Sequence, residues 1–253
     1  MNMSISPTNR TVVITGASAG IGRALALEYA ARGCWLGLLG RRQSALESLR
    51  AEIVGMGAPS AEIAVLDVDD VDSVRPCLDR LFERIGAVDV FVANAGINGF
   101  TRVGAGDFAV DRRIIQTNVL GALACLDAAA AQFIARRAGH LVGISSLASM
   151  IAVPTQGAYC ASKAALSAYL RTARIELARH GIRVSNVTPG FVLTEIMPDI
   201  GKYPFAIPAA QAAREIADAL DAGQREVIVP GWPWKLFKPF FGFIPDSMWR
   251  RFG

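Results

Sequence analysis

The sequence predicts a single α/β domain in which a parallel β-sheet is covered by helices on both faces. Short apolar runs alternate with helix-like segments along the 253 residues, as expected where helices connect parallel strands. The runs VFVANAG at 90–96 and HLVGISS at 140–146 are apolar without alternation, which is typical of strands buried on both sides. A glycine-rich turn also separates the first apolar run from the first helical segment.

One domain over residues 1–253 is expected, because this length is near the upper limit for a single core and no internal repeat or linker is visible. Apolar residues make up 52% of the chain, enough for a sheet covered on both faces. Apolar and β-branched runs predict seven parallel strands, at residues 11–15, 34–39, 61–66, 88–93, 139–145, 182–187 and 225–229.

The glycine-rich turn has the context of a dinucleotide-binding motif. TVVIT at 11–15 reads as a strand, TGASAGIG at 15–22 follows, and 23–33 has helical periodicity that ends at a glycine. Gly16 permits a tight turn, while Gly20 and Gly22 let backbone and helix approach a pyrophosphate at the helix N-terminus. The spacing is G-x-x-x-G-x-G. The alternative is a tight turn without a ligand.

Two further fragments bear on the cofactor. At the end of the second apolar run, Arg41 and Arg42 stand where an NAD-preferring site usually has Asp or Glu. Arginine there suits a 2′-phosphate, although both arginines could instead cap the next helix in solvent. Asp67, with Val68 beside it, ends the third run and is expected to face the adenine. The sequence thus favours NADP(H), with NAD(H) as the alternative.

Tyr159 and Lys163 lie four residues apart in an alanine-rich segment, which places them on one helix face one turn apart. A nearby ammonium favours the phenolate, so the spacing predicts a tyrosine whose pKa is lowered toward neutral pH. Such a tyrosine can serve as a general acid or base. The spacing alone is common on surface helices, and it gains meaning from the glycine-rich turn.

Six fragments together resemble the short-chain dehydrogenase/reductase family over nearly the whole chain. They are TGASAGIG at 15–22, ANAG at 93–96, Asn118 within QTNVLGAL, ISS at 144–146, YCASK at 159–163 and PGFVLT at 189–194. The resemblance implies a Rossmann-like doubly wound fold. It also implies that Tyr159 is the general acid or base, with Lys163 as its partner, and that Ser146 binds the substrate oxygen. Asn118 resembles the residue that anchors a water leading protons to the lysine.

The resemblance also implies the residues that bind the cofactor. Asn94 resembles the strand-stabilising asparagine near the adenosine, and Val192 and Thr194 would contact the carboxamide and phosphate ends. Many NADP-dependent members carry a basic or hydroxyl residue at the position of Ala19, which leaves Arg41 as the main 2′-phosphate ligand. The full expected set is Gly16, Ser18, Ala19, Gly20, Ile21, Gly22, Arg41, Arg42, Asp67, Val68, Asn94, Ala95, Gly96, Tyr159, Lys163, Pro189, Gly190, Val192 and Thr194.

Other classes of function fit the sequence poorly. The net charge of +4 comes from scattered basic residues, so no nucleic-acid partner is expected. His140 and His180 have no partners at a metal-binding spacing and are expected to end a helix or turn, so no metal is expected. No G-x-S-x-G turn surrounds Ser146, which excludes a typical serine hydrolase. Unpaired cysteine spacing and the absence of a signal-peptide pattern predict a cytoplasmic protein.

The segment at about 190–208 is predicted to be a lid over the substrate. Its apolar side chains are Phe191, Ile196, Met197, Ile200, Tyr203, Phe205 and Ile207. In the family that it resembles, this segment covers the substrate cleft, which here implies a lipophilic carbonyl or alcohol. The alternative is that these residues pack against a neighbouring subunit of a homodimer or homotetramer.

The C-terminal tail at 230–253 is rich in aromatic residues, prolines and basic residues. Packing between subunits or closure of the pocket is one interpretation. Peripheral contact with a membrane is another, because aromatic rings and cations suit a lipid headgroup region. A disordered tail is the third.

The function predicted from these features is NADP(H)-dependent interconversion of a carbonyl and a secondary alcohol on a lipophilic substrate. The alternatives are an NAD-dependent dehydrogenase and a catalytically silent protein that senses nucleotides or is recruited to a membrane.

Overall fold

The computed structural model describes residues 10–195 and 203–243, and its centre is one seven-stranded parallel sheet. The order of the strands is β3-β2-β1-β4-β5-β6-β9. The sequence prediction of seven parallel strands is confirmed, with every boundary within two residues of the expected one. The strands are β1 (Thr11–Thr15), β2 (Trp35–Gly40), β3 (Ala61–Val65), β4 (Val90–Ala93), β5 (His140–Ile144), β6 (Arg183–Pro189) and β9 (Glu226–Val229).

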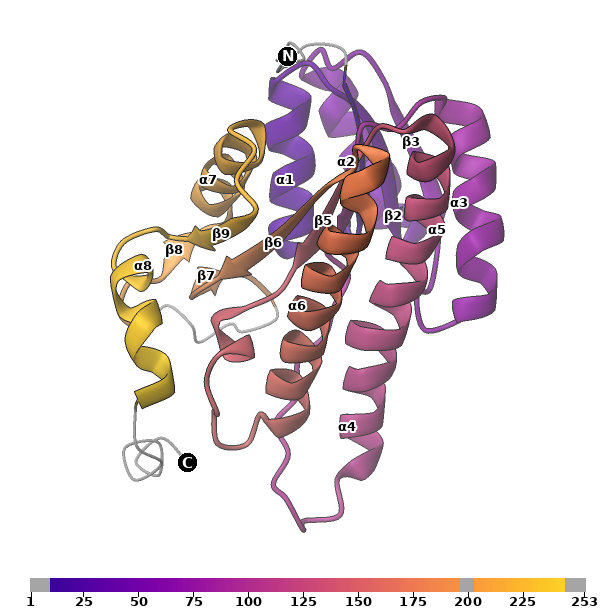
Figure 1. Cartoon of the computed structure of the whole chain (residues 1–253). Helices are drawn as coiled ribbons and strands as arrows, with labels where there is room; N and C mark the ends of the chain where they lie inside the picture. Colours follow the sequence, from indigo (N-terminus) through magenta and orange to yellow (C-terminus); the bar gives the residue numbers. More distant parts are fainter. Residues whose placement is uncertain (1–9, 196–202, 244–253) are drawn as a thin grey trace.

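Helices connect the strands and lie on both faces of the sheet (Figure 1). The α-helices are α1 (Gly20–Ala31), α2 (Gln43–Gly55), α3 (Val71–Ile85), α4 (Phe108–Ile115), α5 (Ala122–Arg136), α6 (Gly157–Leu177), α7 (Ala209–Asp221) and α8 (Trp234–Phe237). The 3-10 helices are η2 (Leu147–Ser149), η3 (Ala178–His180) and η5 (Lys238–Phe243), and η1 (Gln116–Gly121) is a π-helix.

The sheet separates two hydrophobic cores, and alternate residues of each strand point into one or the other. Val12 and Ile14 of β1 pack with α1, α2 and α7, whereas Val13 between them packs with α3, α5 and α6. Burial on both sides explains why the strands are continuously apolar in sequence. The predicted doubly wound, Rossmann-like fold is therefore confirmed.

The order of the strands reverses between β1 and β4. From β1 the chain continues outward to β2 and β3, and from β4 it continues outward in the opposite direction to β5, β6 and β9. In parallel sheets, the loops beyond the carboxyl ends of two such strands diverge and leave a crevice between them. The topology therefore places a ligand site beyond Thr15 and Ala93.

Helices α4, η1 and α5 form one continuous helical segment over residues 108–136. Its length, and a mean hydropathy of 1.5 over an 18-residue window within it, are sufficient for a membrane span. Here the segment covers a face of the sheet, and Cys125, Leu126, Ala129 and Phe133 are buried in the second core. Packing against the sheet and α3 accounts for the apolar face of this helix.

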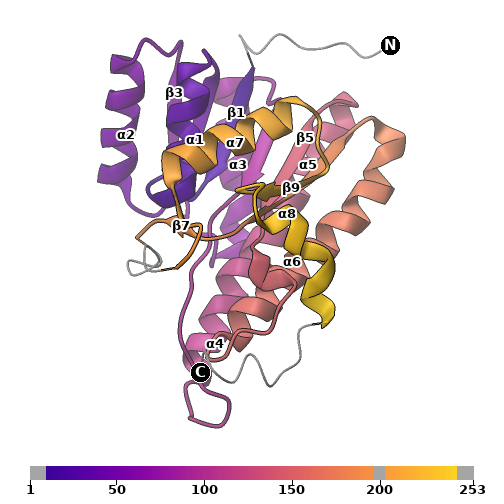
Figure 2. The same cartoon turned by 90° about the vertical axis from the view of Figure 1, so that its left-hand side faces the viewer.

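A small parallel sheet of β7 (Val192–Leu193) and β8 (Ile207–Pro208) follows the end of β6. Helix α8 follows β9 and lies beside it (Figure 2). The described part of the predicted lid contains this sheet. Residues 196–202, with the predicted lid residues Ile196, Met197 and Ile200, lie outside the described residues, as do residues 244–253 of the tail.

One sequence expectation about the histidines is wrong. His140 does not end a turn: it is the first residue of β5 and is buried, with its Nε2 2.8 Å from Ser185 Oγ. His180 ends η3, as expected. Among residues 10–195 and 203–243, no group of three or more metal-ligating side chains could hold a metal ion.

Candidate active site

The glycine-rich turn is held tightly against the end of β4. Gly16 has φ +66°, and a Cβ on it would lie 2.8 Å from the Cα of Ala95. A Cβ on Gly22 would lie 2.5 Å from the carbonyl oxygen of Gly16. No side chain larger than hydrogen fits at either place, so the backbone of this turn remains open to a ligand.

Asn94 and Thr15 hold the turn in place. Asn94 Nδ2 donates to the carbonyl oxygens of Thr15 at 2.9 Å and Gly16 at 3.3 Å. Thr15 Oγ1 accepts from the backbone N–H groups of Asn94 at 3.0 Å and Ala95 at 3.1 Å. These bonds connect the ends of β1 and β4 directly across the crevice. The family-based expectation that Asn94 stabilises the strand ends has a structural basis in them.

The first turn of α1 fits the phosphates of a dinucleotide. Its N-cap is Ala19, so no side chain bonds to the free N–H groups that begin the helix. Gly20, with φ +54°, turns the chain into the helix, and Thr194 approaches it from beyond β7. Unpaired N–H groups and the positive end of the helix dipole form a site for an anion.

The two arginines expected to bind a 2′-phosphate lie at the carboxyl end of β2, and their contacts differ from each other. Arg42 Nη2 donates to Ser18 through both its carbonyl oxygen, at 3.1 Å, and its hydroxyl, at 3.2 Å. Arg41 forms a 3.7 Å ion pair with Asp67 at the end of β3. Sequence reasoning made Arg41 the main ligand, yet Arg42 is the arginine that lies on the glycine-rich turn. Both guanidinium groups are exposed on this edge.

Tyr159 and Lys163 lie one turn apart on α6, as predicted, beside Ser146 at the end of β5. The hydroxyl groups of Tyr159 and Ser146 are hydrogen bonded. Lys163 Nζ lies 5.7 Å from the centre of the Tyr159 ring and donates to the carbonyl oxygen of Ile144 at 2.9 Å. Ser146 is the N-cap of η2, and its Oγ accepts from the N–H of Ala148 at 3.2 Å.

Asn118 joins this group from the π-helix η1. Its Oδ1 accepts from the N–H of Ile97 at 2.8 Å, and its Nδ2 donates to Ile97 O at 2.9 Å and Ser162 Oγ at 3.1 Å. A Cβ on Gly96 would lie 3.2 Å from Asn118 Oδ1 and 3.5 Å from Lys163 Nζ, so both polar groups face the same short stretch of backbone. The π-helix is of the kind often found at functional sites.

The pKa values of the pair differ from the sequence expectation. Burial raises the pKa of Tyr159, and the hydrogen bond from Ser146 only partly opposes this. Burial also lowers the pKa of Lys163 from 10.5 to about 8. The spacing predicted a tyrosine with a lowered pKa, and that prediction is wrong for this structure. The cost of removing each charge from water, which depends on tertiary burial, outweighs the local pairing.

The remaining expected residues lie where the chain leaves β6. Pro189 ends β6, and the N–H of Gly190 donates to Val229 O at 2.7 Å. Val192 is buried in β7, and Val68 is buried under the π-helix at Gly121. The structure thus places the expected residues together at the carboxyl ends of the parallel strands. They come from β1, β2, β3, β4, β6 and α6, or from the loops that follow these strands.

Sequence reasoning missed an aromatic cluster around Trp234 of α8. The Trp234 ring lies 5.6 Å from Phe191, 6.0 Å from Phe205 and 6.4 Å from Phe237, and its Nε1 is packed over Gly190. A Cβ on Gly190 would lie 3.2 Å from Cδ1 of Leu147, the residue after Ser146. The sequence signal was the aromatic PGWPWK stretch after the last strand. Of its two tryptophans, Trp234 packs into the cluster and Trp232 is exposed.

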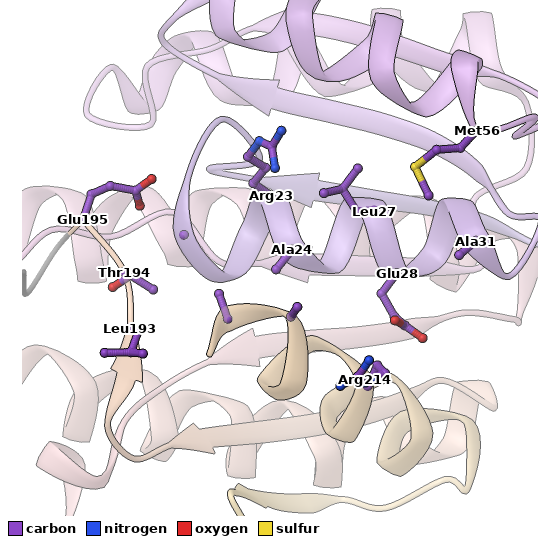
Figure 3. A pocket seen from close by; sticks show the side chains of 13 residues that line it. Arg23, Ala24, Leu27, Glu28, Ala31, Met56, Leu193, Thr194, Glu195 and Arg214 are labelled. Carbon is purple, nitrogen blue, oxygen red and sulfur yellow. The ribbon is translucent and has the colours of Figure 1, made fainter. Parts of the chain in front are cut away.

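A groove with a volume of about 690 Å³ runs along α1 between α2 and α7 (Figure 3). It begins at Gly20 and Thr194, by the expected phosphate site, and passes Ala24, Leu27 and Ala31. Tyr159 and Ser146 do not line it. The groove therefore adjoins the cofactor end of the site and not its catalytic end.

Comparison with known proteins agrees with this arrangement. The model of the family described as short chain dehydrogenase matches residues 10–203. This chain belongs to the short-chain dehydrogenase family. An uncharacterized oxidoreductase of Myxococcus xanthus is 38% identical over 91% of this chain and 90% of the relative.

Two solved structures show the same fold. A short-chain type dehydrogenase/reductase from Mycobacterium marinum has a TM-score of 0.82 and 29% identity, over 90% of this chain and 97% of the other. An alcohol dehydrogenase from Thermococcus sibiricus, complexed with 5-hydroxy-NADP, has a TM-score of 0.80 and 29% identity, over 87% and 96%. The protein is an oxidoreductase of the short-chain dehydrogenase family.

Proposed function

We propose that this short-chain dehydrogenase interconverts a carbonyl and a secondary alcohol on a lipophilic substrate, with NADP(H) as its cofactor. The observation that carries the proposal is the hydrogen-bonded hydroxyl pair of Tyr159 and Ser146 beside buried Lys163. These groups lie at the same edge of the sheet as the open glycine-rich turn. A proton donor, an oxygen-binding hydroxyl and a dinucleotide cradle are the parts that carbonyl reduction requires.

When bound, the nicotinamide cofactor supplies hydride to the carbonyl carbon or accepts it from the alcohol. In the reductive direction negative charge grows on the carbonyl oxygen, and the hydroxyl groups of Ser146 and Tyr159 donate hydrogen bonds to it. The raised pKa of Tyr159 keeps its phenol protonated at neutral pH, so that it can deliver the proton. In the oxidative direction, Tyr159 takes that proton back.

Lys163 and Asn118 position the tyrosine and its surroundings. The Lys163 ammonium, held by Ile144 O, favours the phenolate that forms when Tyr159 gives up its proton. Asn118 is fixed through both atoms of its amide group, which suits the family role of anchoring a water near the lysine. We assign the four residues Asn118, Ser146, Tyr159 and Lys163 to catalysis.

The preference for NADP(H) is supported by the two arginines at the end of β2. Arg42 donates to Ser18 of the glycine-rich turn, and Arg41 beside it forms a long, exposed ion pair with Asp67. Guanidinium groups bind phosphate well, whereas NAD-preferring sites place a carboxylate at the end of this strand. The 29% identical Thermococcus sibiricus enzyme is complexed with an NADP derivative.

A lipophilic substrate is supported by the walls next to Ser146. Leu147 is buried beside Gly190, and the aromatic cluster of Phe191, Phe205 and Trp234 continues this surface. Few polar side chains would meet a substrate there, so binding would rest on apolar area. We expect a homodimer or homotetramer in the cytoplasm, as is common in this family.

The experiment is to measure reduction of a series of apolar ketones and oxidation of the matching alcohols. Tyr159→Phe should lower kcat by about 10²–10⁴-fold, the usual contribution of a general acid, and leave cofactor binding unchanged. Ser146→Ala should lower kcat by about 10²–10³-fold through loss of one oxyanion donor. Ser145→Ala is the control, because that hydroxyl bonds to Lys163 O and Ser167 Oγ and not to Tyr159.

The same assay run with NADPH and NADH tests the cofactor. Arg42→Ala should raise the KM for NADPH and hardly change that for NADH, and Arg41→Ala should do so to a smaller degree. Equal KM values for both cofactors in the wild type would favour the NAD-dependent alternative. Wild-type inactivity on the whole panel, with intact NADPH binding, would favour a silent nucleotide sensor.

A further inference from the structure

The segment after β9 has an outer surface that stays exposed. Trp232, Leu236 and Phe240 are 72%, 53% and 60% exposed, and Phe237 is also exposed. We call these four side chains the aromatic patch. Trp234, between them in sequence, turns inward and packs on Phe191 and Phe205. The aromatic patch is thus the solvent-facing side of the segment after β9, and Trp234 on the other side packs against Phe191 and Phe205.

The exposed apolar surface continues from the aromatic patch onto the predicted lid. Tyr203 and Phe205 are both about half exposed. Phe205 contacts Trp234 at 6.0 Å, and Tyr203 contacts Phe191 at 4.8 Å between ring centres. Since Phe191 follows Gly190 directly, this surface borders the apolar entrance to the site. Few soluble monomers leave so many large apolar side chains exposed in one place.

The charge on this surface has one sign. Lys235 and Lys238 are exposed among the patch residues, and within the described part of the chain neither forms an ion pair. The sequence has no Asp or Glu in 203–208 or in 230–243. The surface therefore combines aromatic rings with uncompensated positive charge.

We propose that the aromatic patch docks the protein on an anionic phospholipid bilayer. Trp and Phe rings partition into the headgroup region, and lysines beside them meet lipid phosphates. A second copy of the chain fits less well, because a two-fold interface sets a patch against itself and would bring lysines together without a carboxylate. Docking would also place the entrance of the site at the bilayer surface, where a lipophilic substrate is concentrated. Membrane binding does not depend on the proposed chemistry.

The test is flotation of the full-length protein with vesicles of phosphatidylcholine alone or of equal parts phosphatidylcholine and phosphatidylglycerol. We expect flotation with the anionic vesicles and little with the neutral ones. Lys235→Gln with Lys238→Gln should weaken binding about twenty-five-fold, since each lysine near an anionic surface contributes about a fivefold factor. Replacing Trp232, Leu236 and Phe240 by Ser should reduce flotation to background.

Matched controls lie on α2, where Val54 and Arg50 are exposed. Val54→Ser with Arg50→Gln removes an apolar and a basic side chain and should leave flotation unchanged. The lysine variant keeps every apolar contact, so it tests the proposal even if the serine variant folds poorly. Tyr159→Phe should float like the wild type, which separates this test from that of the enzymatic proposal.

Equal flotation with neutral and anionic vesicles, or none with either, would overturn the proposal. Light scattering after size exclusion tests the alternative that a second copy of the chain binds the patch. If the wild type does not float and the serine variant has a smaller oligomeric mass, the patch is an interface between copies and not a membrane surface.

Discussion

His140 shows at the level of one residue how burial controls a titratable group outside the active site. Its imidazole is 1% exposed in β5, and its Nε2 lies 2.8 Å from Ser185 Oγ, which donates to Gln224 O at 2.6 Å. Burial, with smaller effects of Arg183 and Arg10, lowers the pKa of His140 from 6.5 to about 3. The folded protein therefore keeps this histidine neutral across the physiological range.

This lowered pKa predicts that stability falls on acidification. Between about pH 6.5 and pH 3 the unfolded chain binds a proton at His140 that the folded chain does not, so the free energy of unfolding decreases as pH falls. The slope from this group is at most about 1.4 kcal/mol per pH unit. His140→Gln keeps a polar partner for Ser185 but does not titrate. Urea unfolding at pH 7 and pH 5 should show a smaller loss for the variant, and equal losses would contradict the prediction.

At the same scale, the sequence located the side chains proposed for catalysis but not their pKa values. Tyr159 and Lys163 could be placed because helix geometry fixes the relation of residues four apart. Their pKa values could not, because these depend on what the rest of the chain packs around them. The pairing of Arg41 with Asp67, and of Arg42 with Ser18, likewise depends on how two loops meet.

At the scale of elements, α8 and the segment after β6 are joined by the aromatic cluster around Trp234. Trp234 contacts Phe191 on one side and Phe237 on the other, so the two segments share one set of apolar contacts. Edge-to-face aromatic pairs contribute about 0.5–1.5 kcal/mol each beyond their buried area. The position of the segment that lines the substrate entrance therefore depends on α8.

Trp234→Leu should consequently weaken binding of lipophilic substrates. Loss of one or two ring contacts predicts a KM for apolar ketones about tenfold higher, since about 1.4 kcal/mol corresponds to tenfold. The KM for NADPH should change less than that for the ketones, because the ring contacts of Trp234 are with other aromatic side chains and not with the glycine-rich turn. Trp232→Leu, at a tryptophan 72% exposed, is the matched control in vesicle-free assays. Equal effects of both substitutions on the ketone KM would argue against the role of Trp234.

The sequence was most informative about long, strongly patterned elements. Runs such as TVVIT at 11–15 are apolar and β-branched throughout, and each became a strand. The two-residue strands β7 and β8 carry no such pattern, and the π-helix at 116–121 follows from a local shift in hydrogen bonding within an otherwise regular helix. Neither could be read from periodicity.

At the scale of the whole molecule, an ion-pair network joins the start of the described chain to the end of α7. Asp221, at the end of α7, lies 2.7 Å from Arg10 before β1 and 2.8 Å from Arg32 after α1. The Arg10 side chain is only 7% exposed. Arg32 also binds Asp218, which is 72% exposed. Helices α1 and α7 are thereby fixed to each other and to the start of the sheet.

Asp221→Ala should destabilise the fold strongly, because it leaves the buried Arg10 guanidinium without its anion. Breaking such a pair costs about 3–5 kcal/mol. Asp218→Ala removes an exposed partner of the same network and should cost below about 1 kcal/mol. The two free energies of unfolding, measured in urea at neutral pH, provide the comparison. Similar values for both variants would mean that the burial of Arg10 does not govern the network.

The close packing of the Trp234 indole over Gly190 couples evolution at these two positions. A methyl group at position 190 would displace an aromatic ring that four other rings hold in place. Natural variants with alanine or serine at 190 should therefore carry a smaller side chain at 234, and the two positions should covary among relatives. Libraries that aim to accept bulkier ketones would have to randomise both codons together.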